Sequence, residues 1–172
     1  MIILGIDPGS VITGYGVIEA RGRQYRLLDQ GVLRPGSRKP LADRLKVIYD
    51  GLCEVIDRNH PELVAVESTF GGRFPRAALV LGHARGVALL AAANRGLQIW
   101  EYAPREVKSA IVRAGGASKQ QVQYMVSAML NLDRGPGSEP LPEDASDALA
   151  VAICHYHRIT GGIKAVDRIR RR

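Results

Sequence analysis

The first ten residues contain the feature that most constrains the fold, an apolar strand that ends in a carboxylate. The run Ile-Ile-Leu-Gly-Ile at positions 2–6 is typical of a strand that is buried on both faces of a sheet. The run ends at Asp7, and Pro8 and Gly9 then indicate a turn. A carboxylate at the end of a buried strand is costly unless it is paired or holds a cation. Asp7 is therefore predicted to be either a cap of the turn or the first ligand of a metal site.

Length and cysteine content restrict the class of protein. We expect one domain over residues 1–160 and a mobile basic tail at 161–172. Cys53 and Cys154 lie in apolar segments without metal-binding spacing, which predicts reduced core thiols in a cytoplasmic protein. The chain begins directly in a strand, so we expect no leader. The longest apolar run, Val87–Ala93, is too short to cross a bilayer, and no membrane partner is expected.

The charge balance points to the kind of partner. The chain has 24 lysines and arginines against 17 acidic residues, which gives a formal net charge of +7. A basic surface gains free energy by releasing the counterions of a polyanion, so the composition favours nucleic acid as the partner. Charge alone does not establish such binding, because many basic proteins bind no nucleic acid.

The hydrophobic pattern predicts an α/β protein. Strands are expected at 2–6, 14–19, 25–33, 63–66 and 98–102, and helices at 41–59, 77–95, 105–113, 118–132 and 143–159. The first three strands are joined by short turns and predict an antiparallel meander. The helix that follows predicts a crossover to a strand parallel to the first. Asp7 and Glu67, which end these two strands, are then expected at the same edge of the sheet.

The loop at 68–76 has an unusual composition. It contains both phenylalanines of the chain, Phe70 and Phe74, together with Arg73 and Arg76. One phenylalanine anchored in the core is a sufficient structural explanation. The functional alternative is that the aromatic rings stack or wedge against bases while the arginines contact phosphates.

Two patterns in the predicted helices each allow a structural and a functional interpretation. Ala78, Gly82 and Gly86 form a stripe of small residues, which favours packing on the sheet or, alternatively, a dimer interface. Ser118 and Gln121 form a capping box, with Lys119 in the first turn of the helix. That lysine is either solvated or placed to contact a phosphate.

The last predicted helix begins with a pair of acids. Asp144 and Asp147 are three residues apart and project from one helical face. Stabilisation by the helix dipole explains such acids without a functional role. If the helix packs beside the two parallel strands, however, the pair joins Asp7 and Glu67 in one site. Such a cluster needs counter-charge, which Mg²⁺ supplies, and two ions would promote hydrolysis of a phosphodiester.

Four motifs occur in an order that resembles a known family. They are Ile-Asp-Pro-Gly, Ala-Val-Glu-Ser-Thr-Phe, Gly-His-Ala-Arg-Gly and Glu-Asp-Ala-Ser-Asp-Ala-Leu-Ala. Together they resemble the RuvC family of bacterial Holliday-junction resolvases over residues 1–160. The resemblance implies an RNase H-like fold, with a five-stranded mixed sheet of three antiparallel strands followed by two parallel strands, flanked by helices. It also implies a homodimer that nicks two opposed strands of four-way junction DNA, beside the branch-migration proteins RuvA and RuvB.

The same resemblance implies roles for individual residues. The catalytic carboxylates and ligands of two Mg²⁺ ions, for which Mn²⁺ would substitute, are Asp7, Glu67, Asp144 and Asp147. The DNA-binding candidates are Phe70, Arg73, Phe74, Arg76, Lys108 and Lys119, with Phe70 as the wedge. Two positions near these residues differ from the family pattern or vary within the family. Ser146 stands where alanine is more usual, and some members carry histidine at the position of Asp144.

Two other classes of function compete with the nuclease. Actin-like and sugar-kinase-like phosphotransferases also place an aspartate and a glycine turn after their first strand, but they carry a second glycine-rich phosphate motif. A junction-binding scaffold without catalysis explains the basic charge and the aromatic loop, although not four acids at strand and helix ends. We therefore expect a metal-dependent junction endonuclease.

Overall fold

The computed structural model describes the backbone of residues 1–68, 75–112, 117–132 and 141–170, and the side chains of these residues up to Gly161. The five strands form one sheet in the order β3-β2-β1-β4-β5. Their bounds are β1 Ile2–Asp7, β2 Thr13–Arg21, β3 Gln24–Leu33, β4 Leu63–Glu67 and β5 Gln98–Tyr102. β1, β2 and β3 pair antiparallel, and β4 and β5 continue the sheet in parallel. The predicted mixed sheet is therefore confirmed.

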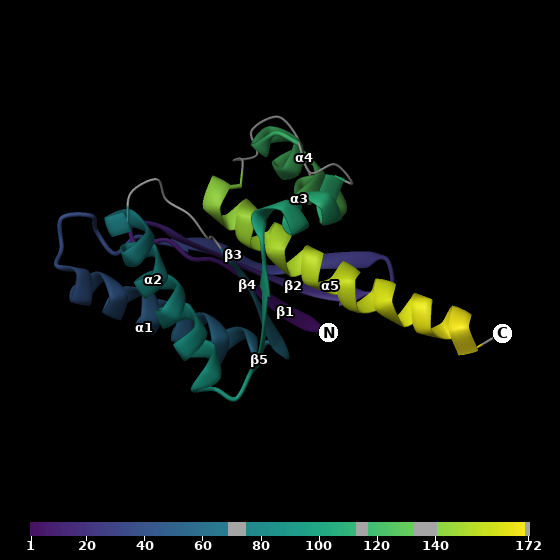
Figure 1. Cartoon of the computed structure of the whole chain (residues 1–172), viewed down its shortest axis with the longest axis horizontal. Coiled ribbons are helices and arrows are strands. Elements are labelled where there is room, and N and C mark those ends of the chain that lie inside the picture. The colour runs from purple at the N-terminus through teal and green to yellow at the C-terminus, as the bar shows by residue number, and fades with distance from the viewer. Residues whose placement is uncertain (69–74, 113–116, 133–140, 171–172) are drawn as a thin grey trace.

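Helices cover both faces of this sheet (Figure 1). Their bounds are α1 Leu41–Asn59, α2 Pro75–Ala93, α3 Pro104–Val112, α4 Lys119–Met129 and α5 Glu143–Arg170. One core contains Leu4, Val17 and Val64 together with side chains of α1 and α2. The other core contains Ile3 and Ile18 together with side chains of α3, α4 and α5. Successive strand residues point to opposite faces, so the near-continuous apolar runs supply both cores.

The apolar periodicity predicted most element positions to within two residues. The first helix and the last strand agree with the structure at both ends. Ser118 caps α4, and its side chain accepts from the N–H of Gln121 as the capping box requires. Cys53 and Cys154 are buried free thiols, as expected, and belong to the two different cores.

The predicted end of the last helix was wrong. α5 continues through Gly161 to Arg170, whereas the sequence pattern predicted an end at Ile159. Two adjacent glycines lower helix propensity locally, which is why the pattern favoured an earlier end. The backbone of the basic segment at 161–170 is therefore helical. Its mobility stays a prediction.

The stripe of small residues on α2 does not pack on the sheet. The buried residues of this helix are Ala84, Ala88, Ala91 and Ala92. A Cβ atom added at Gly82 or Gly86 would meet nothing within 4 Å. The packing interpretation of that stripe was therefore wrong, because a different face of α2 contacts the rest of the protein.

By length and composition, α2 is the one described helix that is apolar enough to cross a bilayer. The length of its longest apolar run had predicted that it does not cross a bilayer. The length and composition of α2 are weak support for a membrane span, because core helices of soluble proteins pass the same test.

Candidate active site

Asp7 and Glu67 meet at the edge of the sheet where β1 and β4 end. These strands are parallel, with Ile6 paired to Val66, so the next residue of each strand carries its carboxyl group to the same place. The two carboxyl groups form a hydrogen bond. The predicted pairing of these acids at one edge is confirmed by this geometry.

The turn after β1 is held by a residue other than Asp7. The hydroxyl group of Thr13 donates to the carbonyl of Gly9 at 2.6 Å, and the N–H of Gly9 donates to the same hydroxyl at 3.2 Å. Thr13 is fully buried, so this pair of hydrogen bonds is shielded from water. The turn is thus held by the hydroxyl group of Thr13, and the alternative that Asp7 also caps it stays a prediction.

Glycines in β1 and β2 allow α5 to lie directly on the sheet. A Cβ atom at Gly14 would lie 1.9 Å from the carbonyl oxygen of Asp144, and one at Gly5 would lie 2.0 Å from that of Ala148. Both distances are impossible for a real side chain, so only glycine permits this approach. Gly14 is also the residue that pairs with Asp7 across the strands. This contact therefore brings the first turn of α5 to the carboxylate edge.

Asp147 of α5 lies within reach of a lysine from α4. Lys119 Nζ is 3.4 Å from Asp147 Oδ2 and forms a second ion pair with Glu143. The side chain of Asp147 is 23% exposed, whereas Lys119 and Glu143 are more than half exposed. The interpretation of Lys119 as a merely solvated surface lysine was wrong. Glu143 faces solvent and also binds this lysine.

Burial and mutual repulsion perturb the acids at this edge. Burial, the nearby charge of Asp7 and the hydrogen bond between the two carboxyl groups raise the pKa of Glu67 to about 8. Burial also raises the pKa of Asp7 to about 6, against the lowering effect of that hydrogen bond. The pKa of Asp147 is raised by burial too, and Lys119 opposes this rise. The positive charge near these acids is therefore too small to offset the effects of burial and mutual repulsion on their pKa values.

The donor chemistry of this edge fits a hard divalent cation. All four predicted ligands are carboxylates, and oxygen ligands of this kind are preferred by Mg²⁺ and Mn²⁺. In the described ranges, no three His, Cys, Asp or Glu side chains are close enough to hold one ion as they are placed. This is the arrangement expected where like charges repel and Lys119 binds Asp147. A cation would favour the ionised forms of Asp7 and Glu67, whose pKa values are raised by burial and by the neighbouring acids.

The remaining predicted residues are not gathered at this edge. Lys108 lies half-buried on α3 and makes no hydrogen bond or ion pair to another described residue. Arg76 is exposed in the first turn of α2. Phe70, Arg73 and Phe74 lie outside the described residues.

Sequence reasoning missed the residues that position the site. Thr13 and the glycines of β1 and β2 carry no chemistry of their own, and none was predicted to matter. The pattern Gly14-Tyr-Gly16 inside a strand was the available signal, because glycine in a strand often marks a close approach of another backbone.

The family model for crossover junction endodeoxyribonuclease RuvC matches residues 3–155. The chain belongs to this family. A RuvC from Marinobacter nauticus is 51% identical over 156 residues, which cover 91% of this chain and 86% of that protein. A RuvC from Pelotomaculum thermopropionicum is 48% identical over 160 residues, which cover 93% of this chain and 95% of that protein.

The solved structures of the RuvC family support the same assignment. The structure of Thermus thermophilus RuvC in complex with a Holliday junction substrate matches with a TM-score of 0.86 and 36% identity. The match covers 94% of this chain and 96% of that one. The predicted RNase H-like fold is thereby confirmed, since the sheet and its helices correspond over nearly the whole length.

Proposed function

We propose that this chain is an endodeoxyribonuclease that resolves four-way DNA junctions by paired symmetric nicks. The observation that carries the proposal is the meeting of Asp7 and Glu67 with the acidic start of α5 at one edge of the sheet. Membership of the RuvC family, whose relatives are named crossover junction endodeoxyribonucleases, supports the same reaction. The net charge of +7 suits a DNA substrate.

The catalytic residues in this proposal are Asp7, Glu67, Asp144 and Asp147. They would hold Mg²⁺, two ions per site, with Mn²⁺ as a substitute. When bound, these ions would supply an activated water and stabilisation of the leaving oxygen. Asp7 lies between Glu67 and the first turn of α5, so it is the carboxylate best placed to serve both sides of the site.

DNA contacts in this proposal come from side chains around the carboxylate edge. Lys119 provides a positive charge at the N-terminus of α4, where backbone N–H groups also favour a phosphate. In the structure its partners are carboxylates. When these carboxylates bind metal, the lysine would be released to bind a phosphate of the DNA. Lys108, Arg73 and Arg76 are further proposed phosphate contacts. Phe70 is the proposed wedge at the junction centre, with Phe74 beside it in the same loop.

We propose a homodimer as the active assembly, because two opposed strands must be cut. The exposed face of α2 is suited to this contact. Leu79 is 63% exposed and Leu90 is 51% exposed, and Gly82 and Gly86 leave room for a close approach of a second copy. A free apolar face of this kind is a typical interaction surface. From the family resemblance we also propose RuvA and RuvB as partners, and the cytoplasm as the location.

A labelled four-way junction tests the proposed reaction. The junction is incubated with Mg²⁺ or Mn²⁺, and the products of all four strands are separated. We expect paired nicks on opposed strands for the wild type. Asp7→Asn should bind the junction but leave it uncut, whereas Asp43→Asn, the same change in the exposed first turn of α1, should cut normally.

Three results would contradict this proposal. Binding without nicks by the wild type would favour a scaffold. ATP hydrolysis without DNA cleavage would favour a phosphotransferase. Cleavage by Asp7→Asn at the normal rate would show that the carboxylate site is assigned wrongly.

A further inference from the structure

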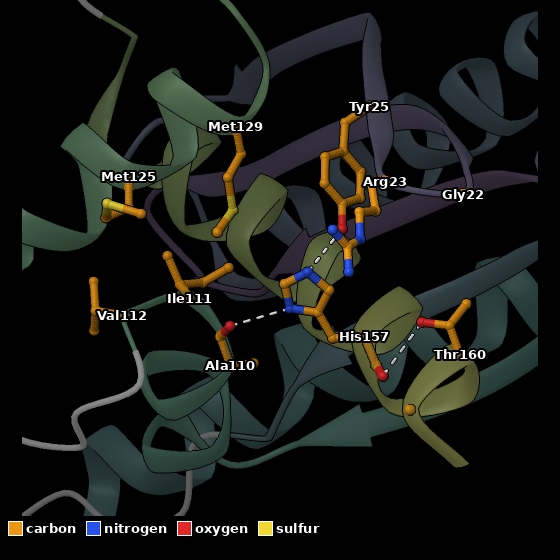
Figure 2. A pocket seen from close by; sticks show the side chains of 11 residues that line it. Gly22, Arg23, Tyr25, Ala110, Ile111, Val112, Met125, Met129, His157 and Thr160 are labelled. Atoms are coloured by element: carbon orange, nitrogen blue, oxygen red, sulfur yellow. Dashed lines mark hydrogen bonds between the residues drawn. The ribbon is translucent and has the colours of Figure 1, made fainter. Parts of the chain in front are cut away.

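A pocket lies far from the carboxylates, between the β2–β3 turn and the helices α3, α4 and α5 (Figure 2). Its volume is about 740 Å³. Along α5, Thr160 in this pocket lies about 24 Å from Asp144, given the rise of an α-helix. The residues that matter here are Arg23, Tyr25, Ile111, Met125, Met129 and His157. The proposed reaction uses none of them.

One side of this pocket is apolar. Met125 and Met129 lie one turn apart on α4, and Ile111 and Val112 approach from the end of α3 (Figure 2). The methionines and Val112 are partly buried side chains at the margin of the core formed by α3, α4 and α5. Methionine side chains are flexible and polarizable, so they adapt to different apolar groups. An inserted aliphatic or aromatic side chain would therefore extend this core.

The opposite wall is pre-formed by hydrogen bonds between three elements. His157 Nδ1 lies 3.1 Å from the carbonyl oxygen of Ala110 and must donate to it, because a carbonyl only accepts. His157 Nε2 then accepts from the hydroxyl group of Tyr25 at 2.7 Å. These bonds link β3, α3 and α5, so the pocket does not depend on a ligand to acquire its shape.

The rim of this pocket is basic. Arg23 is exposed on the β2–β3 turn and makes no ion pair with another described residue. A smaller adjoining hollow shares Ala110 and His157 with the first and adds Arg105, which is likewise exposed and without an ion pair among the described residues. The acid of that hollow, Glu106, already binds Arg158. Two arginines thus offer donors to an acidic ligand.

We propose that this pocket binds an acidic segment of a partner protein. One apolar side chain of the segment inserts against Met125 and Met129, and its carboxylates bind Arg23 and Arg105. DNA is the less suitable occupant, because a phosphate backbone would use the arginines but leave the apolar side of the pocket unfilled. The apolar side and the basic rim of the pocket together select a peptide that carries an apolar residue beside acidic residues.

Methyl NMR of the full chain tests this proposal directly. The chain has three methionines, Met1, Met125 and Met129, so labelling the methionine methyl carbon gives two probes inside the pocket and one outside it. The ligands are a panel of synthetic octapeptides in which aspartate and glutamate surround one leucine, isoleucine or phenylalanine. We expect at least one peptide to shift the signals of Met125 and Met129 and to leave that of Met1 unchanged.

Two charge variants on the same hairpin provide the matched comparison. Arg23→Glu should weaken binding of the peptide by about tenfold, since one charge-assisted contact is replaced by repulsion. Arg21→Glu makes the same change of charge on an exposed residue that does not line the pocket, and it should bind as the wild type does. Cleavage of a four-way junction should be unchanged in both variants, because neither arginine belongs to the proposed catalytic or DNA-binding set.

Three outcomes would overturn the proposal. The first is that no peptide shifts the pocket methionines at about 1 mM, a concentration that detects even weak complexes. The second is equal binding of a peptide whose apolar residue is replaced by serine, which would leave only general charge attraction. The third is that junction DNA shifts Met125 and Met129 and that Arg23→Glu weakens DNA binding, which would assign this surface to DNA.

Discussion

Replacing Gly14 by alanine tests whether the glycine contact with α5 positions the carboxylates. The new Cβ atom would lie 1.9 Å from the carbonyl oxygen of Asp144, whereas ordinary contacts begin at 3.4 Å. The sheet and the helix must therefore separate by about 1.5 Å, the difference between these two distances. This movement would carry Asp144 and Asp147 away from Asp7.

The expected effects on stability and on activity differ in size. Overpacking of this kind costs about 1–3 kcal/mol of the free energy of unfolding. For a chain of this length each kcal/mol lowers Tm by about 2–4 °C, so Tm should fall by about 2–12 °C. A displacement of about 1 Å in an active site can lower the rate about 100-fold, and cleavage should fall by at least that factor.

The assay combines thermal unfolding with single-turnover cleavage of a four-way junction, at a temperature well below Tm of the variant. Circular dichroism first establishes that Gly14→Ala is folded. Gly16→Ala serves as the control, because its new Cβ would meet the side chain of Leu149 at 2.5 Å and the backbone of α5 only at 3.1 Å, so a smaller separation of helix and sheet relieves the contact. We expect this control to lose less stability and much less activity.

Two results would refute the reasoning about Gly14. If Gly14→Ala cuts the junction at the rate of the wild type, the helix is not the element that sets the distance between the carboxylates. If Gly16→Ala is as inactive as Gly14→Ala, the loss follows from general disturbance of β2 rather than from the contact with Asp144.

Three further predictions concern single side chains. Phe70→Ala should slow cleavage with little change in Tm, and a large fall in Tm would instead identify Phe70 as a core residue. Lys119→Ala should reduce the salt dependence of junction binding by about one phosphate contact, whereas an unchanged slope would restrict Lys119 to its carboxylate partners. Burial holds the pKa of His155 below its usual value of 6.5, so the unfolded chain binds a proton more readily, and the free energy of unfolding should fall as the pH decreases below that value. Urea unfolding at several pH values should show a smaller pH dependence for His155→Gln, which cannot titrate there.

Local patterns were sufficient to predict the elements of this fold. The apolar run of β1 and the periodicity of α1 arise within short stretches of chain, so both were visible in the sequence. The meeting of Asp7 and Glu67 followed from the parallel crossover between their strands. These predictions needed no knowledge of which surfaces touch.

Several predictions that depended on distant contacts failed, and other such contacts were not predicted. Whether Gly82 faces the sheet or solvent depends on the rotation of α2, which its own sequence does not determine. The partners of Lys119 are Glu143 and Asp147 on another helix, and the local pattern offered only solvent or a phosphate. The close approach of Gly14 to Asp144 joins residues from opposite ends of the chain. Such contacts become visible only when the elements are assembled.

The contact between Gly14 and Asp144 has a consequence for the variability of this site. It is made by the main-chain carbonyl of Asp144, so its geometry does not depend on which side chain residue 144 carries. Substitution at this position can therefore alter the ligand without moving the helix. The side chain at position 144 can thus change while its place in the site stays the same, whereas position 14 must remain glycine to permit the close approach of the helix.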